Sequence, residues 1–228
     1  MRLVIASALS LAVLPVAAPA AVRSFPVGGF DRVKNSTPFD VRVHTGGRPA
    51  VRADGTDKAL ERLEVTVRGG ELVIGTRQGS WWNWGSGMKA VIDVTVPALT
   101  GVSLSGPGNL SVDRVRAGAF SATLSGPGDI NIGALQADSV TIGLSGPGGV
   151  TVAGRARTAR IRLSGPGDVR AGGLVVRDAD LSLSGPGDIS IGATGSARGT
   201  LSGPGDIHVQ GGATCQIRKS GPGDVHCR

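Results

Sequence analysis

The sequence predicts an all-β protein whose chain forms a parallel β-solenoid, or β-helix, with coils of 18–20 residues. The tetrapeptide Ser-Gly-Pro-Gly occurs seven times, and successive copies start 18 to 20 residues apart. On both sides of each copy, apolar residues alternate with polar ones, as in a strand with one buried face. Each unit is therefore strand, turn and strand, and the regular period indicates a repeat architecture. The copies begin at Ser105, Ser125, Ser145, Ser164, Ser184, Ser202 and Ser220.

Residues 1–20 have the pattern of a secretory signal peptide. Arg2 precedes an apolar run from Leu3 to Val16, which ends in Ala18-Pro19-Ala20. A transmembrane anchor is the alternative, but the run is shorter than the roughly 20 apolar residues that span a bilayer. We expect an exported chain, cleaved after Ala20, with no later segment that could cross a membrane as a helix.

Residues 21–100 lack the tetrapeptide but keep the alternation of strands, for example in Phe39-Asp-Val-Arg-Val and in Leu63 to Val67. Glycine pairs separate these segments as turns. We expect this section to form the first, less regular coils of the solenoid and its N-terminal cap, in one continuous domain with the repeats of residues 101–228. A separate small β-domain is the alternative.

The repeated turn is represented by Ser125, Gly126, Pro127, Gly128 and Asp129. Proline fixes φ near −65°, and the glycine after it is expected to supply the positive φ of a type II turn. Coils stack at roughly 4.8 Å, so a bulky corner side chain would meet its own copy in the next coil. A ladder of hairpins would not need identical turns. We therefore expect a stacked corner in a three-sided coil, followed by a looser corner and a third strand.

Cys215 and Cys227 are the two cysteines, and both fall on inward-facing positions of the last coil. An even pair in an exported chain predicts a disulfide, which would staple the terminal coil. Lys219 replaces the inward leucine of the other units, as suits a position that no further coil covers.

Two sets of potential metal ligands stand out. The aspartates that follow the corners could bind Ca²⁺, or could hydrogen-bond the backbone of their own turns; the second is favoured because one motif per coil supplies few ligands. Asp206, His208, Asp224 and His226 share one face of two adjacent coils and could bind Zn²⁺. Two solvated imidazoles duplicated with the repeat are the alternative. The corner aspartates are Asp129, Asp168, Asp188, Asp206 and Asp224.

Aromatic and basic side chains supply candidate ligand contacts. Trp81, Trp82 and Trp84 lie between glycines and could stack on sugar rings or a membrane interface, or could simply close the end of the solenoid. Arginines lie around the third and fourth units, where they could meet the aspartate column, an anionic glycan or only solvent. They are Arg155, Arg157, Arg160, Arg162, Arg170 and Arg177.

Several segments in a fixed order also carry a resemblance to a known family. They are Phe39-Asp-Val-Arg-Val, Leu63 to Val67, Gly70-Glu-Leu-Val-Ile, Val94-Thr-Val-Pro-Ala-Leu and the repeats typified by Gly128-Asp-Ile-Asn131. From about Phe30 to Cys227 the chain resembles the autotransporter-adhesin head GIN domain family of exported bacterial proteins. The resemblance implies a right-handed β-helix-like fold and no established biochemical activity.

These observations favour an exported, non-enzymatic scaffold with an adhesin-like or glycan-binding role, in the periplasm, on the cell surface or outside the cell. A polysaccharide-processing β-helix enzyme is the alternative, but coils that differ by two residues leave little material for the walls of a cleft. We expect no cofactor. Nucleic acid is disfavoured as a partner because an exported chain with few aromatic residues offers little for bases to stack on.

Overall fold

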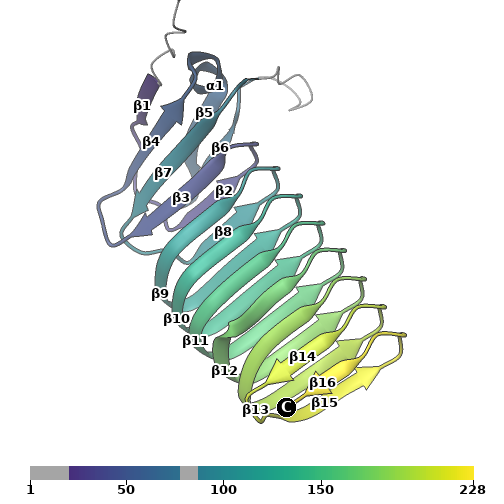
Figure 1. The fold of residues 1–228 in the computed structure, drawn as a ribbon. Helices are drawn as coiled ribbons and strands as arrows, with labels where there is room; N and C mark the ends of the chain where they lie inside the picture. The colour runs from purple at the N-terminus through teal and green to yellow at the C-terminus, as the bar shows by residue number, and fades with distance from the viewer. Residues whose placement is uncertain (1–20, 78–86) are drawn as a thin grey trace, which may run out of the picture.

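The computed structural model describes residues 21–77 and 87–228 as a long stack of strands (Figure 1). One edge of the stack carries sharp corners and the opposite edge is rounded. The sixteen strands of the described residues belong to one hydrogen-bonded sheet. The predicted signal peptide and Trp81, Trp82 and Trp84 lie outside the described residues.

The elements fall into an N-terminal set and a repeat set. The N-terminal set is β1 (Ala21–Phe25), β2 (Arg32–Asn35), β3 (Asp40–Thr45), β4 (Ala50–Gly55), α1 (Asp57–Arg62), β5 (Leu63–Arg68), β6 (Glu71–Thr76) and β7 (Ala90–Val96). The repeat set is β8 (Gly101–Leu104), β9 (Leu110–Leu124), β10 (Ile130–Leu144), β11 (Val150–Leu163), β12 (Val169–Leu183), β13 (Ile189–Leu201), β14 (Ile207–Gln210), β15 (Thr214–Lys219) and β16 (Val225–Cys227). Among the described residues, no helix is long and apolar enough to cross a membrane.

The repeat section confirms the predicted parallel β-solenoid. From β9 to β13 each strand pairs in parallel with the next, and the apolar residues form a continuous interior. Within β9 the inward alternation shifts phase twice, at the exposed pairs Asp113–Arg114 and Gly118–Ala119. The coil therefore has three sides, and the looser corner that was expected takes the form of two bends inside a single 15-residue strand.

The Ser-Gly-Pro-Gly corners stack directly on one another, and space rather than φ requires their glycines. The prediction of a positive φ at the second glycine is wrong, because no motif glycine has one. Instead, a Cβ on Gly187 would lie 2.8 Å from the carbonyl carbon of Gly167 and closer still to its oxygen. The same collision recurs down the column, so any side chain at these positions would push two coils apart.

The N-terminal section joins the solenoid in an order that differs from the order of the chain. The coil formed by β2 and β3 lies between β6 and β7 on one side and β8 and β9 on the other. Beyond it, β4 pairs antiparallel with β7, and β5 pairs antiparallel with β6. The less regular first coils that were expected correspond to β2, β3, β6 and β7, whereas β1, β4 and β5 turn antiparallel and form the cap (Figure 1).

The β2–β3 coil has its own corner, at residues 36–39, and a buried asparagine holds it. Ser105 donates its backbone N–H to Asn35 O at 2.9 Å, so this corner stacks on the first Ser-Gly-Pro-Gly. The Asn35 side chain donates to Phe39 O at 2.9 Å and accepts from the backbone N–H and the hydroxyl of Thr37. Asn35 and Thr37 are the buried polar residues of the described chain. Their mutual hydrogen bonds offset the cost of burying them.

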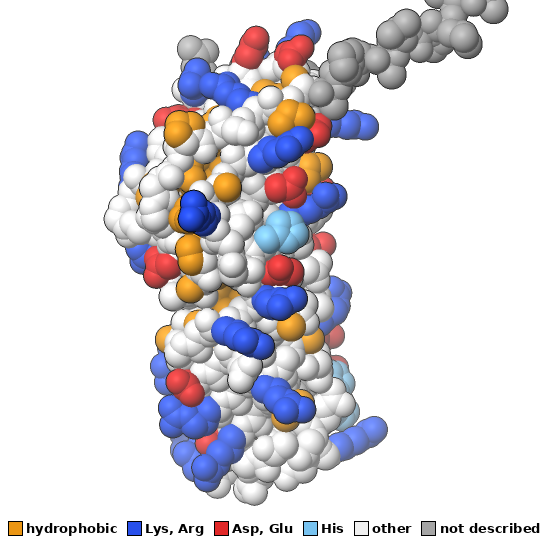
Figure 2. All heavy atoms as spheres, turned by 90° about the vertical axis from the view of Figure 1, so that its left-hand side faces the viewer, with side chains coloured by type: hydrophobic (Ala, Val, Ile, Leu, Met, Phe, Trp, Pro, Cys, Tyr) orange, Lys and Arg blue, Asp and Glu red, His pale blue; other side chains and the backbone are white. Residues whose placement is uncertain are grey.

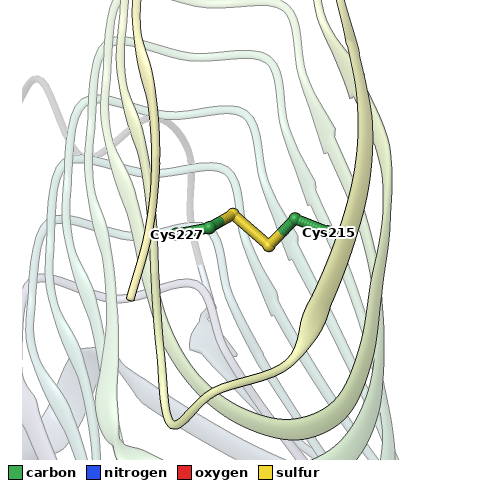
Figure 3. The surroundings of a disulfide bond; sticks show 2 residues. All are labelled: Cys215 and Cys227. Carbon is green, nitrogen blue, oxygen red and sulfur yellow. A yellow bond between two sulfur atoms is a disulfide. The ribbon is translucent and has the colours of Figure 1, made fainter.

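The predicted disulfide closes the opposite end. Cys215 of β15 and Cys227 of β16 are bonded across the interior between the two walls of the last coil (Figure 3). Lys219 is exposed, as expected for a position without a covering coil, and its ammonium group lies 2.6 Å from Asp224 Oδ1.

Candidate functional site

A basic groove lies at the rounded edge of the solenoid, where β9, β10 and β11 bend. Its volume is about 510 Å³, and its floor includes Val115 and Leu135. Arg116, Gln136 and Arg155 occupy equivalent positions on the three strands and all point outward. A second hollow of about 560 Å³ adjoins it and shares two of these residues, together with Asp138. The full lining of the first hollow is Asp113, Arg114, Val115, Arg116, Ala134, Leu135, Gln136, Gly154 and Arg155.

The groove coincides with an irregularity in the stack. Between two paired positions, β10 runs from Ile132 to Leu135 whereas β11 runs from Val152 to Gly154, one residue fewer. Gly154 has a φ of +134°, and a Cβ there would lie 2.5 Å from the backbone nitrogen of Leu135. The glycine therefore brings β11 close to β10 at the bend, and it leaves no side chain to fill the groove.

The arginines of the groove have no ion-pair partner among the described residues. Across residues 21–77 and 87–228, Arg114, Arg116 and Arg155 form no ion pair. By contrast, Arg160 lies 3.0 Å from Asp180 and Arg170 lies 2.7 Å from Asp168. Figure 2 looks onto the rounded edge and shows basic side chains along its lower, repeat-bearing part. The guanidinium groups of the groove are therefore free for an external anion.

The groove contains one carboxylate next to the arginines, that of Asp113. This carboxylate accepts the backbone N–H groups of Thr45 and Arg114 and lies 3.6 Å from His44 Nδ1. These contacts fix it at the rim of the groove. It can orient the hydroxyl groups of a ligand, since an ionised carboxylate accepts hydrogen bonds.

The aspartates at the corners connect successive coils. Asp188 Oδ1 accepts the backbone N–H of Asp206 at 2.8 Å, and Asp206 Oδ1 accepts that of Asp224 at 2.7 Å. Likewise, Asn109 Oδ1 accepts the backbone N–H of Asp129. The expected hydrogen bond to the aspartate's own turn is thus replaced by a bond to the next coil. One oxygen of each such carboxylate is engaged in the fold, which leaves fewer ligands for Ca²⁺.

The predicted metal ligands are brought together only in part. His208 and His226 are register partners, and their rings stack 4.8 Å apart at an angle of 7°. One ligand atom each from Asp206, His208 and His226 lies within 4.8 Å of the others. Asp224 is instead held by Lys219, whose hydrogen bond and charge lower the pKa of this carboxyl below its usual range. The fourth predicted ligand is therefore engaged elsewhere.

Most of the chain matches a known protein family. The family described as "Putative auto-transporter adhesin, head GIN domain" matches residues 29–213. The chain belongs to this family. No protein with a curated description matches it significantly.

Solved structures with the same fold as this GIN-domain chain include proteins from Bacteroides and Parabacteroides. A "putative adhesin" from Bacteroides fragilis is 24% identical, with a TM-score of 0.86, and the match covers 92% of this chain and 97% of that one. A "putative adhesin" from Parabacteroides merdae is 17% identical, with a TM-score of 0.74 and coverages of 92% and 96%. A "putative lipid binding protein" from Parabacteroides distasonis is 18% identical, with a TM-score of 0.69 and coverages of 92% and 97%. At these identities the likeness shows the fold.

Sequence reasoning on this GIN-domain chain found Arg155 but missed Arg114, Arg116 and Gln136. The spacing held a usable signal, because Arg116 and Arg155 stand at the same place in units separated by a single coil. The equivalence of Arg116 and Arg155 was missed because β11 has one residue fewer than β10 before Gly154, which shifts the sequence numbering of the later unit relative to the earlier one.

Proposed function

We propose that this GIN-domain protein is an exported, non-enzymatic binding scaffold that holds an acidic glycan of the cell envelope in the basic groove. The observation that carries the proposal is the outward column Arg116, Gln136 and Arg155, in which no arginine is paired with a carboxylate of the described chain. Family membership and the disulfide support export, because disulfides persist in oxidising compartments.

The spacing of the column suits an extended polyanion. Arg116 and Arg155 are two coils apart, which places their Cα atoms roughly 10 Å from each other. Planar guanidinium groups recognise carboxylates and sulfates through paired hydrogen bonds. Gln136 between them offers both a donor and an acceptor to a sugar hydroxyl. The adjoining hollow around Ala137 and Asp138 extends the groove along the bent edge. A chain with repeated anionic groups fits this surface better than a single small anion.

The rigid scaffold favours binding without turnover. Arg155 projects from a position paired with both β10 and β12, and Arg116 from a position paired with β10, so little backbone must be reorganised when a ligand binds. General acid–base cleavage needs a group that can deliver a proton. The carboxylate of Asp113 is already engaged with two backbone N–H groups and His44. We therefore expect retention of the polymer and no shortening of it.

The test is a binding titration with polygalacturonate, with neutral dextran as the uncharged control polymer. The Arg116→Ala, Arg155→Ala double variant should weaken binding by about tenfold or more, because hydrogen bonds to charged groups contribute about 1.5–3 kcal/mol each when they are desolvated. The Arg162→Ala, Arg218→Ala variant removes the same charge from a different wall of the solenoid and should bind like the wild type. Binding should weaken steadily with added salt.

Three results would contradict this function. Equal losses in both double variants would indicate only a general charge effect. Release of shorter products from the polymer would favour the enzyme alternative. Binding to anionic lipid vesicles but not to polygalacturonate would point to a membrane ligand. The same assay applied to Trp81→Ala, Trp82→Ala and Trp84→Ala tests the sequence-based proposal that these residues contact sugar.

A further inference from the structure

The outer face of β14 and β16, near the C-terminal end of the solenoid, carries a cluster of three metal-ligating side chains. His208 and His226 are in register on the two strands, and their rings lie parallel, 4.8 Å apart. Asp206 precedes His208 by two residues and therefore faces the same side. A hollow of about 340 Å³ lies beside the rings and is also lined by Val209, Gln210 and Arg228.

The ligand atoms of this cluster are available. In the part of the chain that the structure describes, neither imidazole has a hydrogen-bond or ion-pair partner, and the two rings stack on each other. Asp206 uses Oδ1 to accept the backbone N–H of Asp224, which orients the carboxylate and leaves Oδ2 free. Such a hydrogen bond is the usual way in which proteins fix a ligating carboxylate.

We propose that His208, His226 and Asp206 bind one divalent transition-metal ion of the Zn²⁺ type. Zn–N bonds of 2.0–2.1 Å at a tetrahedral angle need the two nitrogens roughly 3.4 Å apart. The ligand atoms now lie within 4.8 Å of one another, so the two nitrogens need to approach each other by about 1.4 Å at most. Both histidines are exposed, which leaves their rings room for this movement. The remaining coordination position is open to water or to a donor from a ligand.

The donor set determines which ions bind. Two imidazoles and a carboxylate suit Zn²⁺, Cu²⁺ and Ni²⁺, whereas Ca²⁺ and Mg²⁺ prefer sites made of oxygen ligands alone. The equivalent column in the preceding coils holds Ser190 and Arg170, and Arg170 pairs with Asp168. Within the described repeats the site is therefore confined to the last two coils.

The disulfide connects this site to the closed end of the solenoid. Cys227 follows His226 directly and is bonded to Cys215 on the opposite wall. The bond keeps β16, a strand of three residues, paired with β14 and so keeps the two imidazoles together. Reduction should therefore weaken metal binding even though neither cysteine is a ligand.

The experiment is a calorimetric titration of ZnCl₂ into the tag-free, oxidised protein in a buffer that does not bind metals, repeated with CaCl₂. We expect one Zn²⁺ per chain and no Ca²⁺ binding at the same concentrations. The His208→Ala, His226→Ala double variant should lose the binding. Asp206→Asn keeps an oxygen for the Asp224 N–H and should weaken binding by roughly 10- to 100-fold. Asp224→Asn and His44→Ala are the matched controls and should bind as the wild type does.

Nitrogen-15 spectra of the histidine side chains provide a second measurement that does not depend on the variants. Zn²⁺ should shift the signals of His208 and His226 and leave those of His44 unchanged. Absence of binding heat, or unchanged affinity in the double histidine variant, overturns the proposal. One Zn²⁺ per two chains, with a doubled mass in sedimentation, also overturns it, because the ion would then join two molecules instead of two coils.

Discussion

Substitution of Gly187 by alanine provides the sharpest test of why the corner sequence recurs. The new Cβ would lie 2.8 Å from the carbonyl carbon of Gly167 and 3.1 Å from that of Pro166, and closer still to the Gly167 oxygen. These obstacles are backbone atoms, so no side-chain rotation can relieve the contact. The two coils must separate at the corner.

The cost follows from the hydrogen bonds that this separation would break. Three of them surround the contact: Ser184 N–H to Leu163 O at 2.9 Å, Val169 N–H to Asp188 O at 2.8 Å, and Asp188 N–H to Asp168 Oδ1 at 3.1 Å. At about 1 kcal/mol each, the loss is about 3 kcal/mol. This agrees with the roughly 1–3 kcal/mol typical of overpacked sites.

Gly143→Ala is the matched control, since no heavy atom lies within 4 Å of its added Cβ. Alanine should stabilise this strand position by about 0.5–1 kcal/mol. Urea unfolding followed by far-ultraviolet circular dichroism should place the two variants on opposite sides of the wild type. With an m-value of about 2–3 kcal/mol/M, the Gly187→Ala midpoint should fall by about 1 M or more. If both variants unfold at the same urea concentration, stacking space is not the reason for the corner glycines.

Three further predictions concern the contacts that close the ends and join the coils. Asp188→Ala should lower the free energy of unfolding in urea by about 1 kcal/mol, because it removes the acceptor of the Asp206 N–H. Asp188→Asn keeps an acceptor oxygen and should be nearly neutral. Equal destabilisation by the two substitutions would contradict a hydrogen-bonding role. The Cys215→Ser, Cys227→Ser double variant should lower the free energy of unfolding by about 2–4 kcal/mol. Amide hydrogen exchange should become faster in the last coil alone. Faster exchange throughout the chain would show that the bond stabilises the whole fold. Asn35→Leu should lower the free energy of unfolding by more than about 2 kcal/mol, since it removes the buried acceptor of the Thr37 N–H and hydroxyl and the side-chain donor to Phe39 O; an unchanged melting temperature would refute this.

The fold of the repeat section could be predicted from the sequence because equivalent positions in successive units have the same surroundings and therefore similar residues. The corner column, the Cys215–Cys227 bond and the register of His208 over His226 all follow from a fixed period. The requirement for glycine was predicted on two grounds, and only the collision between coils was right. Positive φ was the wrong ground, because a corner held by its neighbours in the stack need not adopt the geometry of an isolated type II turn.

The N-terminal section was expected to form coils, but the corner at residues 36–39 escaped prediction because it lacks the glycines of the later corners. Ser36, Pro38 and Asp40 match the Ser, Pro and Asp of the later corners, but Thr37 and Phe39 stand where those corners have glycine. Every corner Cβ would point toward the coil on its N-terminal side. The insertion of this coil between later strands left no periodic signal in the sequence.

The interlaced N-terminal coil implies a direction for assembly. The strands of residues 32–45 cannot be paired on both sides until β6, β7 and β8 have been made. Once these strands have paired, the backbone N–H groups of the next coil can donate to oxygen atoms that are already in place on the coil before it. The disulfide joins β15 and β16, so it can form only after both of these strands have been made. A chain that folds from its N-terminus would therefore add one coil after another to a completed N-terminal section, and the disulfide would fix the coil of β15 and β16 after the coils before it.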